Sequence, residues 1–301
     1  MSVRAAISQA VRSSEAETII ETQVHNIILE ILDELRNDRL QLPELPALAR
    51  AIHNTVFSSD PSRNMLEKTI ALDATTSQVV IKAANIAAYS NGKQICNLHD
   101  AIQSLAPRMV YNIVLCSTMS SFFQARSPLI NLKMKALWAH CQKIAVYGYV
   151  LAARKKSLNT DEALLAGLVH EIGSLPLFHY IDQNHPQISE HALDRLTGTY
   201  SAPIGFRVLQ NWKFPEPLID VVSEQLNMNF RPKSASPDYI DVISIAKLQA
   251  QTIGKKLAWR NIAAAERLGH YPGDCSRFHE TYAEKLQMIA NMFGMPHPAA
   301  A

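Results

Sequence analysis

The sequence has little glycine, little cysteine and no long uninterrupted apolar run. Its 301 residues include 10 glycines and 4 cysteines. Cys96, Cys116, Cys141 and the distant Cys275 form no CxxC pair, so a thiolate zinc site is not expected. The apolar stretches end well short of the roughly 20 residues that span a bilayer. Scarce glycine and the lack of an alternating strand pattern favour helices almost throughout the chain.

An excess of either charge is also missing. Lys and Arg number 29 and Asp and Glu number 27, which gives a formal net charge of +2. No strong field therefore draws the chain toward nucleic acid or toward an acidic membrane surface. The first residues lack the continuous apolar core of a secretory signal. We expect a cytoplasmic protein that binds neither nucleic acid nor membrane.

Helical periodicity and the positions of proline divide the chain. Apolar residues repeat with helical spacing from Glu15 to Arg36, which predicts an amphipathic helix. This helix either docks on its own chain or joins two chains in a homodimer. The prolines of LPELP, residues 42–46, exclude a helix interior. We expect an N-terminal helix at 1–38, a helical subdomain at 39–125, and a larger helical core with C-terminal helices at 126–301.

The same periodicity predicts the helices that follow LPELP. One of them begins near Thr160 and carries the segment Ala166–Gly173. Pro107 is well placed for the first turn of a long helix, where its missing N–H costs no hydrogen bond. The other predicted helices cover 47–56, 65–72, 76–88, 99–105, 107–123, 129–156, 202–212, 217–226, 238–253 and 278–293.

The segment Ala166–Gly173, AGLVHEIG, places His170 directly before Glu171. An imidazole nitrogen and a carboxylate oxygen are both metal ligands, so the two side chains are suited to one ion. His140 lies one long predicted helix earlier. A His, then a His–acid pair, resembles the ligand order of the HD phosphohydrolase superfamily.

Further motifs narrow the resemblance to the HDOD family. They are LPELP at 42–46, ANIAAY at 84–89, DAIQSL at 100–105, Trp138 before His140, and GFRVLQNWKFP at 205–215. Their order and spacing cover about residues 40 to 230. The resemblance implies an all-α fold, with a smaller N-terminal helical bundle packed on an HD-like helical core. It also implies a bacterial signal-output or regulatory module, a class often without demonstrated hydrolase activity.

The chain departs from the family pattern at the other ligand positions. Glu171 stands where the family carries an aspartate. Ser201 and Gln225 stand where the family carries or often carries histidines, and Lys247 stands where the last aspartate of the HD pattern is expected. An ammonium at Lys247 would repel a divalent cation. These substitutions predict a degenerate metal site.

A hydrolytic metal needs about three or four protein ligands and an open position for water. Only His140, His170 and Glu171 remain, so we expect a non-enzymatic regulatory module with a vestigial or weak site and no required cofactor. Two alternatives stay open. One is a metal-dependent phosphohydrolase acting on a nucleotide or phosphodiester, in which His170 and Glu171 serve catalysis with bound iron, manganese or zinc. The other is a ligand sensor that uses the vestigial pocket.

The expected partner is a protein of bacterial signalling, or a small-molecule ligand. Its binding surface would be the groove between the N-terminal bundle and the core, or an exposed apolar patch near Trp212 and Phe214. A tryptophan beside Lys213 at a helix end suits a partner contact. A tryptophan buried in the core is the competing interpretation.

Overall fold

The computed structural model describes residues 21–22, 24–58, 62–88, 94–224, 236–251, 259, 262–270 and 275–296. Every regular element within these ranges is helical, which confirms the predicted all-α fold. Gln225, one of the predicted lost ligand positions, lies outside the described residues, as do residues 15–20 of the predicted first helix.

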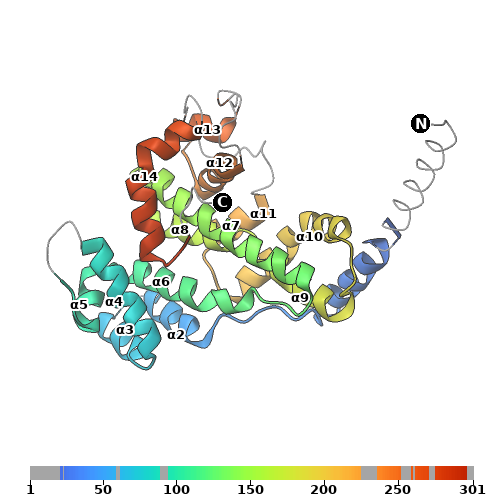
Figure 1. The fold of residues 1–301 in the computed structure, drawn as a ribbon, viewed down its shortest axis with the longest axis horizontal. Coiled ribbons are helices and arrows are strands. Elements are labelled where there is room, and N and C mark those ends of the chain that lie inside the picture. Colours follow the sequence, from blue (N-terminus) through green and yellow to red (C-terminus); the bar gives the residue numbers. More distant parts are fainter. Residues whose placement is uncertain are drawn as a thin grey trace.

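The helices fall into a smaller and a larger group (Figure 1). The smaller group contains α2 (Ala47–Val56), α3 (Arg63–Ile70), α4 (Ala74–Ala88), α5 (Leu98–Ser104), α6 (Pro107–Met119) and the 3-10 helix η2 (Ser120–Phe122). The larger contains α7 (Pro128–Ala152), α8 (Thr160–Val169), α9 (Ser174–Asn184), α10 (Glu190–Asn211), α11 (Glu216–Glu224), α12 (Tyr239–Gln251), α13 (Ala263–Leu268) and α14 (Cys275–Met292). Helix α14 packs on both α4 and α7, so it ties the two groups together.

Local sequence signals explain several helix starts. Pro107 and Pro128 occupy the first turns of α6 and α7, where the missing N–H has no intrahelical partner to lose. The Asn97 side chain accepts a hydrogen bond from the N–H of Asp100 at the start of α5. Asn159 caps α8 in the same way. The predicted starts of these helices at 99, 107, 129 and 160 lie within one residue of the observed starts.

Helix α10 differs from its predicted range of 202–212. It begins at Glu190 and contains Pro203 in its interior. Proline usually marks a helix start because it removes one backbone hydrogen bond. Here tertiary packing supports the helix, because the turn before α9 lies directly against it. A Cβ atom on Gly173 would lie 1.9 Å from the Ser201 carbonyl oxygen, so only glycine allows this approach.

The N-terminal helical segment, residues 24–36, docks on its own chain. Its side chains Val24, Ile27 and Ile31 are buried. Glu30 on its polar side accepts a hydrogen bond from Tyr180 at 3.2 Å and contacts His185 Nε2 at 2.7 Å. The docked interpretation is therefore confirmed for this segment, which lies beside α10 at the far end from α2–α5 (Figure 1). Homodimerisation through the same helix stays a prediction.

One stretch, Thr160–Asn184, is long and apolar enough to cross a membrane by composition alone. Within its most apolar window of 18 residues, 83% is buried inside the protein. The turn at residues 170–173 divides it into α8 and α9. Its apolar character is explained by its place in the centre of the helical core, where a buried helix is apolar on all sides.

Candidate functional site

His140, His170 and Glu171 lie together where α7 meets the end of α8. One ligand atom from each lies within 4.8 Å of the others. Glu171 Oε1 is 4.0 Å from His140 Nε2 and 3.6 Å from His170 Nε2. The structure thus brings together the three side chains that the sequence singles out.

Close packing of α7 and α8 produces this arrangement. A Cβ atom on Gly167 would lie 2.4 Å from Ala145 Cα, so α8 can approach α7 this closely only with glycine there. Helix α8 ends at Val169, and His170 and Glu171 lie in the turn that follows. The prediction that both lie on the helix was wrong, since the chain must turn here to bring Gly173 against α10.

His170 is held by a backbone hydrogen bond. Its Nδ1 lies 2.8 Å from the carbonyl oxygen of Gly167, three residues earlier. A carbonyl only accepts, so Nδ1 carries the proton and donates it. The other ring nitrogen, Nε2, is the one that faces Glu171. This tautomer is the one in which Nε2 presents its lone pair toward the cluster.

Lys247 on α12 enters the same cluster. Its Nζ donates a hydrogen bond to Glu171 Oε1 at 3.3 Å, and its side chain is only 12% exposed. The single carboxylate oxygen Oε1 therefore faces two imidazoles and one ammonium. The structure thus places Lys247 beside His170 and Glu171, where the family pattern predicted it.

Burial and mutual charge set the protonation states. Burial lowers the pKa of His170 to about 3 and also lowers the pKa of His140. Burial by itself raises the pKa of Glu171, but positive charge beside it, with the Lys247 ammonium hydrogen-bonded to Oε1, outweighs burial and holds that pKa below its ordinary value. At neutral pH the cluster therefore contains two neutral imidazoles, one carboxylate and one ammonium. These charges balance without a metal ion.

The remaining predicted residues lie elsewhere. Ser201 is buried on α10, on the stretch that faces Gly173. Trp212 and Phe214 are each 5% exposed, so the expected exposed apolar patch is a wrong prediction. The Trp212 indole donates a hydrogen bond to the Pro43 carbonyl oxygen at 2.8 Å. These side chains are buried because they join the end of α10 to the segment before α2.

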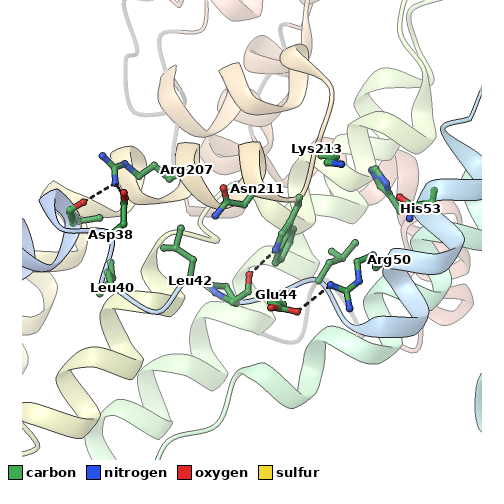
Figure 2. A pocket seen from close by; sticks show the side chains of 14 residues that line it. Asp38, Leu40, Leu42, Glu44, Arg50, His53, Arg207, Asn211 and Lys213 are labelled. Carbon is green, nitrogen blue, oxygen red and sulfur yellow. Dashed lines mark hydrogen bonds and ion pairs between the residues drawn. The ribbon is translucent and has the colours of Figure 1, made fainter.

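Sequence reasoning missed His53. This histidine on α2 is buried among aromatic rings, with centroid distances of 4.6 Å to Phe57, 5.5 Å to Tyr111 and 5.6 Å to Phe214. It also lines a cavity of about 720 Å³ between the segment before α2, α2 itself and the end of α10 (Figure 2). The available signal was a histidine within the apolar sequence ALARAIHNTV of α2.

The fold and the cluster define an all-helical domain with a histidine–carboxylate site between core helices. Residues 42–228, more than half of the chain, match the family model of the HDOD domain. The chain belongs to the HDOD family, which confirms the resemblance drawn from its motifs. The family match does not test the predicted domain boundaries after residues 38 and 125, which stay a prediction.

A curated relative from Treponema pallidum (strain Nichols) is an uncharacterized protein. It is 20% identical over 258 residues, which cover 81% of this chain and 48% of that protein. The chain thus spans about half the length of the curated relative it matches.

Solved structures agree in fold. A "putative metal-dependent phosphohydrolase" from Shewanella amazonensis SB2B has a TM-score of 0.74 at 23% identity, covering 90% of this chain and 99% of that one. An HDOD domain protein of unknown function from Geobacter sulfurreducens has a TM-score of 0.63 at 18% identity, covering 84% and 94%. A "putative signal transduction protein" from Marinobacter aquaeolei VT8 has a TM-score of 0.59 at 18% identity, covering 85% and 59%. At these identities the likeness shows the fold alone.

Proposed function

We propose that this protein is a non-enzymatic, cytoplasmic regulatory module of the HDOD family that acts by binding a protein or a small ligand. The observation that carries the proposal is the contact of Lys247 Nζ with Glu171 Oε1 at 3.3 Å. A hydrolytic metal ion would need the same carboxylate group. The ammonium already neutralises it, so the site is a degenerate one.

The donor set is at the lower limit in number. Imidazole and carboxylate groups suit iron, manganese or zinc. Among the residues that the structure describes, the cluster contains only His140, His170 and Glu171, and it includes a cation. A catalytic ion needs about three or four protein ligands and an open position, and the Lys247 ammonium beside Glu171 would repel it. The residues present therefore do not fit a hydrolytic metal centre.

The similarity of fold to solved structures supports a proposal about the partner. The Marinobacter aquaeolei protein of similar fold is described as a "putative signal transduction protein", and we propose a partner in bacterial signalling for this chain as well. A protein or ligand would bind at the groove between the smaller and the larger helical group, where the cavity of about 720 Å³ lies. The near-neutral charge argues against nucleic acid and membrane surfaces as partners.

Elemental analysis and an activity panel test this proposal. Wild-type protein purified without chelator is expected to contain much less than one metal ion per chain. It is also expected to show no turnover of cyclic dinucleotides, nucleotides or phosphodiesters. Tightly retained iron, manganese or zinc at one ion per chain, lost in His140→Ala and His170→Ala, would overturn the proposal. Turnover that disappears in His170→Ala would do the same.

A metal-dependent phosphohydrolase is the second candidate, because three ligand atoms do lie within 4.8 Å of one another. The Shewanella amazonensis protein described as a "putative metal-dependent phosphohydrolase" has the same fold. This function requires Lys247 to leave Glu171 when an ion binds. An anomalous diffraction signal between His140 and His170 in crystals soaked with manganese, with Lys247 turned away, would favour this candidate.

A further inference from the structure

The cavity beside α2 contains a mixture of charged, amide and apolar side chains. Its volume of about 720 Å³ is in the range of pockets that bind small molecules, which is roughly 300–1,000 Å³. Leu42, Leu45 and Trp212 form an apolar wall, and Asn54 and Asn211 supply amide groups. It lies between the two helical groups and apart from the His140 cluster.

Most charges at this cavity are already paired. Arg50 contacts Glu44 at 3.2 Å, and Arg207 contacts Asp38 at 3.3 Å. Figure 2 shows these two pairs at opposite ends of the cavity. Lys213 also lines it and forms no ion pair with any residue that the structure describes. The cavity therefore has one uncompensated positive charge, and a bound monoanion would neutralise it.

His53 adds a buried polar group to the wall. It is 6% exposed, and within the described part of the chain its Nε2 has no hydrogen-bond partner. Burial lowers the pKa of His53, so its ring is neutral at physiological pH. A buried polar atom without a partner has lost its hydrogen bond to water without replacement, which is unfavourable. A ligand group that reaches this nitrogen would remove that cost.

The backbone places two charged residues at this cavity in an unusual conformation. Asp38 has φ 51° and Lys213 has φ 57°, and within the described ranges these are the non-glycine residues with positive φ. Each follows the end of a helix, where glycine is the common residue. Both line the same cavity. Glycine would adopt this backbone conformation without strain at both positions, but the chain has an anion and a cation there, and both line the cavity.

We propose that this cavity binds a small organic anion, with a single carboxylate or phosphate group at Lys213 and an apolar body against Leu42, Leu45 and Trp212. The inference extends the proposed binding role by naming the class of ligand. It does not depend on whether the His140 cluster holds a metal.

Anilinonaphthalene sulfonate, an apolar anion whose fluorescence rises in apolar surroundings, is a direct probe. Wild-type protein is expected to bind one equivalent, with an affinity that falls as salt rises. Lys213→Asn removes the charge, and asparagine tolerates positive φ. This variant should weaken binding by about fivefold to tenfold, as expected for one partly exposed ion pair. Lys82→Gln removes an exposed lysine on α4 and should leave binding unchanged.

Asn211→Trp supplies a second variant that fills the cavity from the exposed last turn of α10. It should abolish probe binding while circular dichroism and the melting temperature remain those of the folded protein. Octanoate and a nucleoside monophosphate then compete with the probe, and displacement by one of them identifies the carboxylate or the phosphate as the preferred group.

Three results would overturn the inference. They are no probe binding by wild type, equal binding by wild type, Lys213→Asn and Asn211→Trp, and displacement by neither competitor. Low metal content in the same preparation would leave the proposed non-enzymatic function standing, so failure of the two ideas can be told apart.

Discussion

Replacement of Lys247 by methionine tests whether the ammonium keeps metal ions out of the cluster. Methionine retains an unbranched stem of similar length and removes the charge. His140, His170 and Glu171 are left in place by this change. We expect Lys247→Met to bind zinc more tightly than wild type does.

The magnitude follows from the distance between Lys247 and Glu171. A zinc ion about 2.1 Å from Glu171 Oε1 would lie at most about 5.4 Å from Lys247 Nζ, since that nitrogen is 3.3 Å from the same oxygen. At this separation a divalent ion and an ammonium repel by about 1.5 kcal/mol at the dielectric constant of water and by about 6 kcal/mol at an effective value near 20. Removing the charge should therefore tighten zinc binding by at least about tenfold, and by up to roughly ten-thousandfold.

Competition with a chromophoric zinc chelator at neutral pH measures this change. Lys82→Met removes an exposed lysine on another helix and should bind zinc as wild type does. The double variant Lys247→Met with His170→Ala should lose the gain, which would tie it to the cluster. Equal affinity for wild type and Lys247→Met would refute the reasoning, as would a gain that survives in the double variant.

Three further predictions concern stability and assembly. Burial lowers the pKa of His270 from 6.5 to about 4, and Arg154 donates a hydrogen bond to its Nδ1 at 2.7 Å. The unfolded chain then binds the extra proton between these values, so stability should fall as pH drops from 6.5 toward 4, by up to about 3 kcal/mol. Urea unfolding at pH 6.5 and pH 4 should show that His270→Gln loses less unfolding free energy over this range than wild type does. An equal loss in the two proteins would contradict this. Gly167→Ala should destabilise the protein by about 1–3 kcal/mol, because the added Cβ meets Ala145 Cα at 2.4 Å. The control Gly198→Ala, whose added Cβ meets nothing within 4 Å, should be neutral or stabilising. Similar unfolding free energies for the two variants would argue against the close contact. Leu29 on the N-terminal helical segment is 53% exposed, so Leu29→Glu should convert a homodimer formed through this helix to a monomer by light scattering, and an unchanged mass would exclude that interface.

The local sequence was sufficient for most helices and for the central cluster. Proline at Pro107 and Pro128 and the asparagine caps act within one turn, so they locate helix starts without knowledge of the fold. The family motifs identified His140, His170, Glu171 and Lys247 because ligand order is a property of the chain. Those residues needed no distance information to be named.

Tertiary contacts determined the features that the local sequence did not predict. Pro203 lies inside α10, where Gly173 packs against the helix, and no window of sequence around Pro203 contains this contact. Trp212 is buried because its indole reaches Pro43, which is 169 residues away along the chain. The cavity exists only where the segment before α2 meets the end of α10, so His53 and Lys213 gain a shared role from folding alone.

The sequence by itself determined the all-helical fold, the family and the members of the His140 cluster, since periodicity, caps and motif order are short-range or one-dimensional properties. Only the tertiary structure decided that Lys247 pairs with Glu171 at 3.3 Å, that Trp212 and Phe214 are buried, and that an uncompensated cation faces a cavity. Each of these depends on which side chains meet across helices far apart in the chain, and burial and charge compensation are set by those meetings.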